Sequence, residues 1–299
     1  MPPATRVRGR ELLDAAIARL AEAGIGMAGV DAEWLLAGVL GVRRFDLYPA
    51  LAHELEEGLA TRFDHAVSRR ARREPLQRIL GWEEFRGLRF VLTPAVLVPR
   101  PETEMLVEWA VTLLPPPAPR RRPLVVDVGT GSGCIACALA HERPDVDLIA
   151  TDTSLAALVL ARSNARRLGL QERVRPVAGD LLAAIGSAKA DLIVSNPPYL
   201  PTDLLAELMP EVRDHEPRAA LDGGADGLRD LRRLVAEARR ALRPSGALVL
   251  ETAGGAQAAE VSALARAAGL AQVTVRRDLA GIERFVAART SAETNSETA

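Results

Sequence analysis

The tetrapeptide Asn196-Pro197-Pro198-Tyr199 can bind a planar amino group, and it follows an apolar run at 191–195 that we predict to be a buried strand. Consecutive prolines remove two backbone N–H donors and stiffen the turn, so the Asn196 side-chain oxygen and the Pro197 carbonyl remain as acceptors. Two acceptors held in one plane can take both hydrogens of an NH₂ group. The ring of Tyr199 offers a flat face on which such a group can stack.

The same tetrapeptide also has an ordinary structural interpretation. An Asn-Pro pair often starts a turn, and this turn could simply close the buried strand. We favour a binding role because the strands that precede it along the chain also end in residues suited to a ligand.

A glycine-rich turn, Gly129-Thr130-Gly131-Ser132-Gly133, joins a predicted strand to a predicted helix. Glycines let the backbone turn tightly and approach a ligand closely. The spacing here is G-x-G-x-G, whereas dinucleotide-binding loops have G-x-G-x-x-G and face a pyrophosphate. The turn therefore predicts a nucleotide-like cofactor, and its spacing argues against a dinucleotide.

Three acids, Asp127, Asp152 and Asp180, stand at the ends of successive predicted strands. Asp152 can accept hydrogen bonds from both hydroxyls of a ribose, and Asp180 is placed where an adenine amino group could donate to it. Asp127, directly before the glycine turn, would repel a pyrophosphate but could hold the ammonium group of a methionine moiety, directly or through water. Together the three acids predict S-adenosyl-L-methionine as the cofactor.

The two sites together predict N-methylation, with residues 196–199 as the catalytic segment. An amide nitrogen is a poor nucleophile because its lone pair is delocalised, so binding both of its hydrogens fixes its plane and favours the more positive nitrogen of the transition state. Alignment with the sulfonium methyl supplies much of the remaining rate. Asn196 cannot act as a general base, but the electrophile is already a cation, so the proton can leave to water after transfer.

From residue 124 onward strands and helices alternate, which predicts an α/β fold with a mostly parallel, Rossmann-like sheet. The predicted strands are 124–128, 147–151, 174–178, 191–195, 247–251, 271–276 and 283–288. The predicted helices are 134–141, 154–168, 228–242 and 256–268.

The first 73 residues have the spacing of a small helical bundle. We expect a second helix to begin near Asp31 as its N-cap and a third to run over 49–73. The arginines Arg69, Arg70, Arg72 and Arg73 are expected to form a solvated helix end, or else to meet a nucleic-acid or acidic partner.

The predicted domains are a helical substrate-docking domain at 1–74, a β-hairpin connector, helix and Pro-rich linker at 75–123, a catalytic domain at 124–289, and a disordered tail at 290–299.

Bulk composition limits the remaining function classes. The 299 residues are 48% hydrophobic and carry a formal net charge of -1, so no global positive field favours nucleic acid, and we expect no direct nucleic-acid binding. Cys134 and Cys137 lack a second Cys pair or a nearby His, so we expect no metal site and interpret both as small apolar helix residues. No apolar run reaches the ~18 residues of a membrane span. We expect a cytoplasmic monomer.

Residues 75–288 closely resemble the HemK/PrmC family of peptide chain release factor glutamine methyltransferases. The motifs that carry the resemblance are Pro75-Leu76-Gln77, Gly81, Glu84-Phe85-Arg86-Gly87-Leu88, Val98-Pro99-Arg100-Pro101-Glu102-Thr103-Glu104, residues 127–136, Ser195-Asn196-Pro197-Pro198-Tyr199, Glu216-Pro217-Arg218, Ala220-Leu221 and Gly223-Gly224. The N-terminal bundle matches in size and helical character only.

The resemblance implies a class I methyltransferase sheet and a specific substrate, the glutamine of the Gly-Gly-Gln loop of bacterial release factors. It implies that the helical domain helps to dock the release factor, that 129–133, Asp152 and Asn196 contact S-adenosyl-L-methionine, and that 196–199 contact the glutamine. Leu181 occupies a position that contacts adenine and that can be aromatic in the family.

Other positions of the resemblance leave alternatives open. Arg100 and Glu102 could line the substrate pocket or could pin the connector to the sheet, and His215 stands where the family usually has an aromatic residue.

Several other functions share parts of this pattern. A ribosomal-protein glutamine methyltransferase would carry nearly all these motifs, and only the docking surface would separate it. A methyltransferase acting on adenine or guanine amino groups would use the same tetrapeptide but would need a segment that recognises its nucleic acid. A non-catalytic binding protein with this fold would have no need of Asp152, Asn196 and Tyr199.

Overall fold

The computed structural model describes residues 6–51, 54–118 and 121–292. By their internal contacts these residues form two compact units. The first comprises Met1–Trp82 together with Met209–His215, and the second comprises Glu83–Leu208 and Glu216–Ala299. The contacts therefore group 209–215 with the N-terminal region, although the sequence predicted this segment within the catalytic domain.

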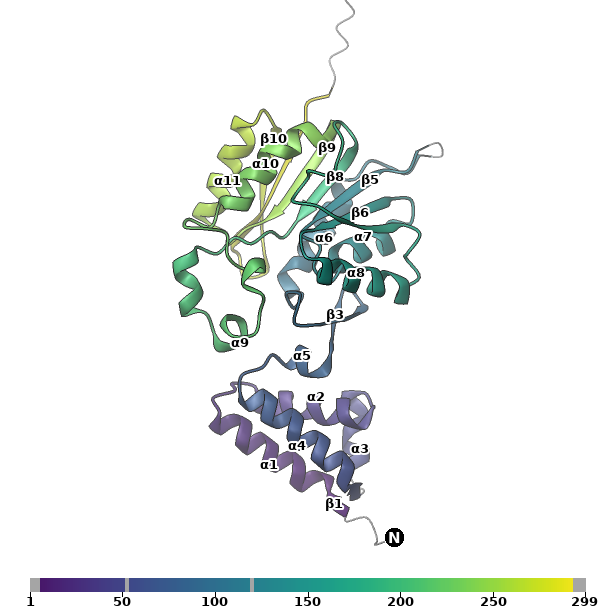
Figure 1. Ribbon diagram of the computed structural model, residues 1–299, viewed down its shortest axis with the longest axis vertical. Helices are drawn as coiled ribbons and strands as arrows, with labels where there is room; N and C mark the ends of the chain where they lie inside the picture. The colour runs from purple at the N-terminus through teal and green to yellow at the C-terminus, as the bar shows by residue number, and fades with distance from the viewer. Residues whose placement is uncertain (1–5, 52–53, 119–120, 293–299) are drawn as a thin grey trace, which may run out of the picture. The chain divides into compact units, whose positions relative to one another are not determined.

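A seven-stranded sheet forms the centre of the second unit (Figure 1). Its strands are β5 (Leu124–Val128), β6 (Asp147–Asp152), β7 (Val174–Ala178), β8 (Ala190–Ser195), β9 (Leu242–Glu251), β10 (Ala271–Arg277) and β11 (Glu283–Arg289). The order is β10-β11-β9-β8-β5-β6-β7, and only the pairings of β11 with β9 and with β10 are antiparallel. The chain order changes direction between β5 and β8, where open α/β sheets usually bind ligands.

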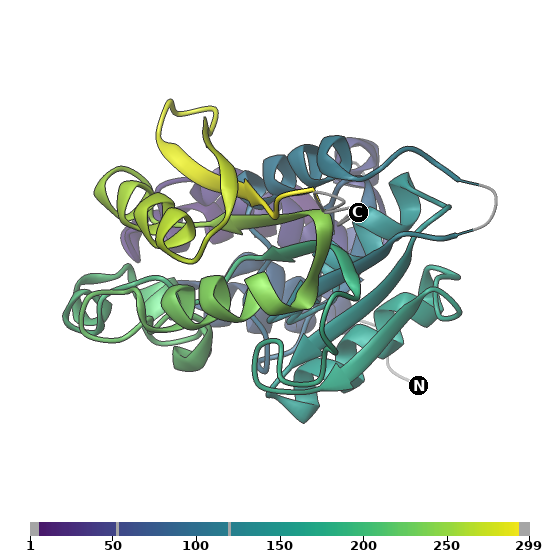
Figure 2. The same cartoon turned by 90° about the horizontal axis from the view of Figure 1, so that it is seen from above.

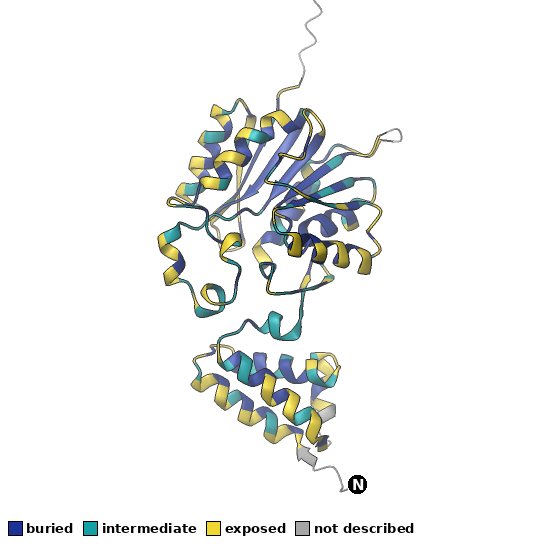
Figure 3. Cartoon of the chain, in the orientation of Figure 1, coloured by how far each residue is buried: buried dark blue, intermediate teal, exposed yellow. Residues whose placement is uncertain are grey.

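Helices cover both faces of this sheet, which lies between two helical layers in Figure 2. They are α6 (Pro101–Leu113), α7 (Cys134–Glu142), α8 (Leu155–Arg167), α10 (Arg229–Ala241) and α11 (Ala256–Ala267). Alternate strand residues face opposite layers, so Val125 packs with α6 and α7 while Val126 packs with α10 and α11. Figure 3 shows the buried strands and the exposed outer faces of the helices.

Two further regions precede and interrupt this sheet domain along the chain, and part of the second region, residues 209–215, belongs to the first unit. A hairpin of β3 (Trp82–Phe85) and β4 (Leu88–Val91) precedes the sheet domain. The long connection after β8 holds the short helices η2 (Thr202–Glu207), α9 (Pro210–Arg213) and η3 (Arg218–Ala220).

The first unit is a bundle with its own apolar core. Its helices are α1 (Gly9–Glu22), α2 (Ala28–Leu40), η1 (Arg44–Asp46), α3 (Leu47–Leu51), α4 (Glu57–Ala71) and α5 (Leu76–Leu80), and a small antiparallel pair joins β1 (Arg6–Arg8) to β2 (Glu54–Glu56).

Charged residues inside this bundle correct two predictions. Asp31 is not an N-cap: α2 begins three residues earlier, and the buried Asp31 carboxylate accepts a hydrogen bond from Arg70 at 2.7 Å. Arg70 is only 8% exposed and also donates to Glu211 at 3.0 Å, as Arg73 does at 2.8 Å. Arg70 and Arg73 therefore satisfy internal carboxylates instead of forming a solvated helix end, because α4 packs against α2 and receives the segment around Glu211.

Three predicted boundaries also change. The helix expected over 49–73 is interrupted, and α3, β2 and α4 share that stretch. The connector begins with helix α5 before its hairpin. Of the expected tail, Thr290 directly follows β11, is buried, and its Oγ1 donates to the Arg243 carbonyl, so this residue packs against the folded domain. Residues 293–299 lie outside the described residues.

Candidate functional site

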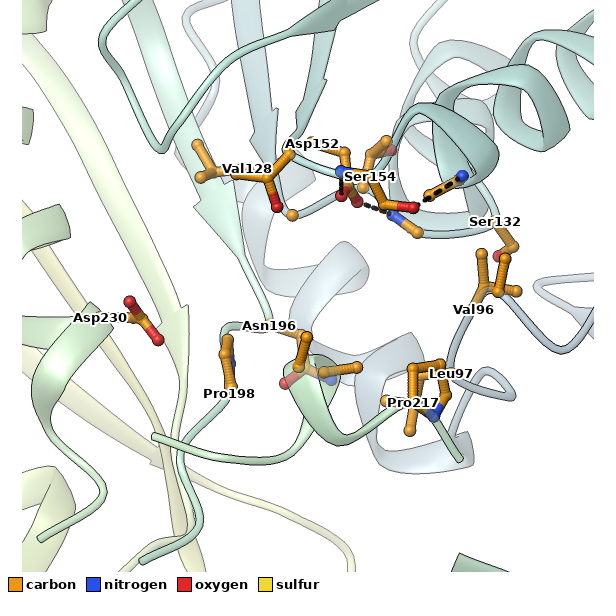
Figure 4. Close-up of a pocket in the computed structure, with 18 of the residues that line it drawn as sticks. Val96, Leu97, Val128, Ser132, Asp152, Ser154, Asn196, Pro198, Pro217 and Asp230 are labelled. Atoms are coloured by element: carbon orange, nitrogen blue, oxygen red, sulfur yellow. Dashed lines mark hydrogen bonds between the residues drawn. The ribbon is translucent and has the colours of Figure 1, made fainter. Parts of the chain in front are cut away.

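A cavity of about 580 Å³ lies at the carboxyl ends of β5, β6 and β8 in the second unit (Figure 4). Its volume is within the range of small-molecule sites. Ten of the predicted site residues line it: Arg100, Gly129, Thr130, Gly131, Ser132, Asp152, Asp180, Leu181, Asn196 and Pro198. Five others are not among the described lining residues: Glu102, Asp127, Gly133, Pro197 and Tyr199.

The glycine turn is fixed by the carboxylate of Asp152. One oxygen of Asp152 accepts a hydrogen bond from the Gly131 backbone N–H at 2.9 Å, and the other accepts from Ser154 N–H at 2.8 Å (Figure 4). Gly131 has a φ of 54°, in the left-handed region that favours glycine. The turn and the second strand end therefore form one wall of the cavity.

Gly133 serves packing instead of ligand contact. Its φ is 82°, and a Cβ atom there would lie 3.1 Å from the Cβ of Ala161 in α8. The predicted cofactor contact at Gly133 is therefore not on the cavity surface, since the missing side chain is what allows α7 to begin beside α8.

Asp127 is fully buried, next to the glycine turn but outside the cavity surface. Its Oδ2 accepts hydrogen bonds from Thr130 Oγ1 at 2.6 Å and from Ala136 N–H at 3.2 Å. Its Oδ1 is buried with no hydrogen-bond partner among the described residues. Burial raises the pKa of Asp127 to about 7, although the hydrogen bonds from Thr130 and Ala136 oppose that shift.

Asp180 and Leu181 form the next part of the wall. Asp180 is about half exposed and pairs with Arg233 at 2.6 Å. Leu181 has a φ of 49°, a conformation that costs free energy for a residue with a side chain, and its carbonyl accepts a hydrogen bond from Thr151 Oγ1 at 3.2 Å. Strained backbone is common at ligand sites, and here it brings residue 181 to the cavity surface.

Asn196 faces the same cavity from the end of β8 (Figure 4). Its Nδ2 donates to Thr103 Oγ1 at 3.0 Å, so its Oδ1 is the side-chain atom left for a ligand. Pro198 lies beside it on the cavity surface.

Tyr199 differs from its predicted place. Its ring packs against the apolar core between the sheet, α10 and α11, and its hydroxyl donates to Glu251 Oε1 at 3.4 Å. Burial raises the pKa of the Tyr199 hydroxyl well above its ordinary value. The Tyr199 ring therefore packs against the core, and Tyr199 is not among the described residues that line the cavity.

Arg100 and Glu102 occupy different environments in the structure. Arg100 lines the cavity and pairs with the buried Glu216 at 3.5 Å. Glu102 is exposed in the first turn of α6, where an acidic side chain favours the helix dipole. Only Arg100 is thus placed to contact a ligand.

Comparison with known sequences supports a methyltransferase of one family. Residues 11–81 match the PrmC N-terminal domain, and residues 107–207 match the methyltransferase small domain. A release factor glutamine methyltransferase of Geobacter sulfurreducens is 44% identical over 94% of this chain and 96% of its own length. Enzymes of the same name from Cereibacter sphaeroides and Mycolicibacterium smegmatis are 45% and 42% identical, over 95% and 94% of this chain and 99% and 97% of their own lengths.

The chain belongs to the release factor glutamine methyltransferase family.

Solved methyltransferase structures share the fold of this family member at low sequence identity. The hMettl16 catalytic domain superposes with a TM-score of 0.57 at 18% identity, covering 77% of this chain and 82% of that structure. A methyltransferase from Pyrococcus furiosus gives a TM-score of 0.52 at 20% identity, covering 69% of this chain and 90% of that structure.

Two residues of this methyltransferase site were missed by the sequence reasoning. Thr103 lines the cavity and donates to Glu251 Oε2 at 2.8 Å, and Glu251 is only 1% exposed. Burial raises the pKa of Glu251 to about 7, against the lowering effects of Thr103 and Arg284. Glu251 ends strand β9, so the same signal that selected Asp127 and Asp152, an acid directly after an apolar strand, could have found it.

The cysteines are not placed for chemistry. Cys134 and Cys137 are buried in α7, and burial raises the pKa of the Cys134 thiol to about 12. Within the described ranges, no group of three or more His, Cys, Asp or Glu residues is arranged to bind a metal ion. None of the described helices has the length and apolarity to cross a membrane.

Proposed function

We propose that this enzyme transfers a methyl group from S-adenosyl-L-methionine to the side-chain amide nitrogen of the glutamine in the Gly-Gly-Gln loop of bacterial release factors. The observation that carries the proposal is the position of Asn196, which faces the same cavity as Asp152 and turns its amide nitrogen towards Thr103. The names and close similarity of the relatives support the choice of substrate.

The residues present fit S-adenosyl-L-methionine. We assign the ribose hydroxyls to Asp152, the adenine to Asp180 and Leu181, and the methionine part to the backbone of 129–131. The buried Oδ1 of Asp127 lacks a partner among the described residues, which suits a cationic ammonium close to the turn, reached by its charge or through water. When bound, the cofactor supplies an electrophilic methyl group on a positively charged sulfur.

The protein's part of the reaction is to bind and orient the amide. The Oδ1 of Asn196 accepts one hydrogen of the substrate NH₂ group, and we assign the other to the Pro197 carbonyl. These two bonds hold the nitrogen in one plane and strengthen as positive charge develops on it. The described side chains around Asn196 include no base in contact with it, so we propose that the proton leaves to water.

We also propose roles for the whole chain. The N-terminal unit helps to dock the release factor, and the enzyme acts as a cytoplasmic monomer without binding nucleic acid directly. The formal net charge of -1 supports a protein substrate over nucleic acid.

The first experiment offers labelled S-adenosyl-L-methionine with a release factor, a ribosomal protein, DNA or RNA in separate reactions. Label is expected only in the release factor, and it should disappear when the Gly-Gly-Gln glutamine is replaced by Glu. Label confined to the ribosomal protein or to nucleic acid would overturn the proposed substrate.

A second experiment tests the role of Asn196. Asn196→Ala should lower kcat by roughly 10²- to 10³-fold, the usual effect of removing one polar group that binds a transition state. Calorimetric affinity for the cofactor should change by less than about tenfold, because Asp152 and the glycine turn remain. A variant that keeps wild-type turnover would remove Asn196 from the mechanism.

A further inference from the structure

We propose that Glu251 and Thr103 are positioning residues that determine which end of the Asn196 side-chain amide faces the substrate. The proposal rests on the proposed function, because it concerns how the amide-binding group of that site is set. The motifs quoted above for the family resemblance do not include Glu251.

The three side chains form a continuous chain of hydrogen bonds from three separate elements. Asn196 follows β8, Thr103 is in the first turn of α6, and Glu251 ends β9. The amide nitrogen of Asn196 donates to Thr103 Oγ1 at 3.0 Å, and Thr103 Oγ1 donates to Glu251 Oε2 at 2.8 Å. The second oxygen of Glu251 accepts from the Tyr199 hydroxyl at 3.4 Å, so this carboxylate contacts one end of the catalytic segment directly and reaches the other end, Asn196, through Thr103.

The direction of these bonds follows from the number of protons available. An ionised carboxylate can only accept, so the single proton of the Thr103 hydroxyl points at Glu251. The Thr103 oxygen can then only accept from Asn196, and of the two ends of an amide only the nitrogen can donate. The Asn196 oxygen is therefore left for the substrate. A flipped amide would place two acceptor oxygens together and would offer donors to a substrate NH₂ group that has only donors of its own.

A purely structural role does not account for a carboxylate at this position. Glu251 is 1% exposed and follows Leu250, which is also buried, so an apolar side chain there would avoid the cost of removing a charge from water. Thr103 is itself only 4% exposed, which keeps competing water away from the hydroxyl. The hydrogen bonds of Thr103 and Tyr199 and the positive charge of Arg284 reduce the cost of burying the carboxylate.

Protonation of Glu251 would release this constraint. A protonated Oε2 could donate to Thr103, and the Thr103 hydroxyl would then be free to donate to the Asn196 side-chain oxygen of the flipped amide. Burial has the largest effect on the pKa of Glu251 and raises it to about 7. The groups that face this carboxylate have smaller effects; they are Thr103 and Glu102 from α6, Tyr199 after β8 and Arg284 from β11. Turnover should therefore fall as the pH drops through about 7.

The decisive test compares two replacements of Thr103. Thr103→Val keeps the shape but removes the hydroxyl, and kcat should fall roughly 10- to 100-fold with little change in KM for the cofactor. Thr103→Ser restores a hydroxyl and should recover most of that loss. Thermal unfolding of both variants identifies any general loss of folding. Equal kcat values for the Val and Ser variants, both folded, would overturn the proposal.

A second pair of variants tests the carboxylate. In Glu251→Gln the side-chain oxygen can still accept from Thr103 while the amide nitrogen meets Tyr199, so most turnover should remain and the fall near pH 7 should disappear. Glu251→Leu should lower kcat as Thr103→Val does. A fall near pH 7 that persists in Glu251→Gln would show that Glu251 is not the titrating group and would contradict the proposed constraint.

The proposal can fail independently of the substrate assignment. The variants are measured on whichever NH₂-bearing acceptor the wild-type enzyme methylates, so a wrong substrate would not remove the Ser-to-Val contrast. The ¹⁵N signal of the Asn196 side-chain amide provides a reading without turnover. Its protons should exchange with water at least about tenfold faster in Thr103→Val than in Thr103→Ser, and equal rates would contradict the proposal.

Discussion

Asp127 and Glu251 are two buried carboxylates at strand ends that differ in how they are held. Both have pKa values raised to about 7 by burial. Asp127 accepts its hydrogen bonds from Thr130 and Ala136, within nine residues of itself along the chain. Glu251 accepts from groups 148 and 52 residues away.

The same contrast holds between two parts of the site. We call the glycine turn with Asp152 and Asp180 the cofactor half, and Asn196 with Thr103 and Glu251 the reacting half. The cofactor half is built mostly from short continuous segments, as when Asp152 binds its neighbour Ser154. The reacting half needs α6, β8 and β9 to be correctly placed before Asn196 is oriented. We infer that the cofactor half depends on local turn geometry and the reacting half on tertiary packing.

The largest effect is expected where packing supports the reacting half, at Gly227. A Cβ atom there would lie 2.3 Å from the Tyr199 carbonyl oxygen and 2.8 Å from Gln257 Nε2, which donates to that same oxygen. Gly227→Ala should lower the free energy of unfolding by about 3 kcal/mol or more in urea denaturation and should reduce turnover.

Gly87→Ala is the matched control for this clash. Gly87 has a similar φ of 71° but open space around the added atom, so only the cost of the left-handed backbone, about 1 kcal/mol, should appear. Equal losses in the two variants would mean that the tetrapeptide does not depend on its contact with Gly227.

A smaller effect is expected in the cofactor half at Asp152. Asp152→Asn leaves one strong acceptor where the ribose and two backbone N–H groups need several, so the cofactor Kd should rise roughly 10- to 100-fold in calorimetry. Turnover at saturating cofactor should change much less. Asp147→Asn, at the other end of β6, is the control and should leave the Kd unchanged. If Asp152→Asn lowered kcat more than cofactor affinity, the proposed separation between the cofactor half and the reacting half would be contradicted.

The pH dependence of stability tests the buried acids themselves. Because the folded pKa values of Asp127 and Glu251 lie above the ordinary 3.8 and 4.5, the native state binds more protons than the unfolded state between about pH 4 and 7. Their contribution to stability is therefore full below that window and is lost as the pH rises through about 7. In Asp127→Asn, the decrease in the free energy of unfolding between pH 5 and 8 should be smaller than in the wild type by on the order of 1 kcal/mol. An unchanged loss in urea titrations would mean that Asp127 titrates normally.

The smallest effect is expected at the solvent-exposed edge of the cofactor half. Asp180 and Arg233 are each about half exposed, and such ion pairs contribute little to stability. Arg233→Gln should free Asp180 for the adenine amino group and change the cofactor Kd by no more than about threefold, towards tighter binding. A weakening of tenfold or more would show that Arg233 itself contacts the cofactor.

The sequence by itself determined the parallel sheet, the glycine turn, the acids at the first three strand ends and the place of Asn196. These features depend on apolar periodicity and on turn chemistry, which neighbouring residues set. The positions of β5 and β7 were predicted to the residue.

Only the tertiary structure decided how the side chains pair across the chain. It packed the Tyr199 ring against the core, placed Asp31 and Arg70 together inside the bundle, and brought Thr103 to Glu251. Such pairings depend on which elements lie side by side. Strand order and helix packing fix that arrangement, and local sequence patterns carry no record of it.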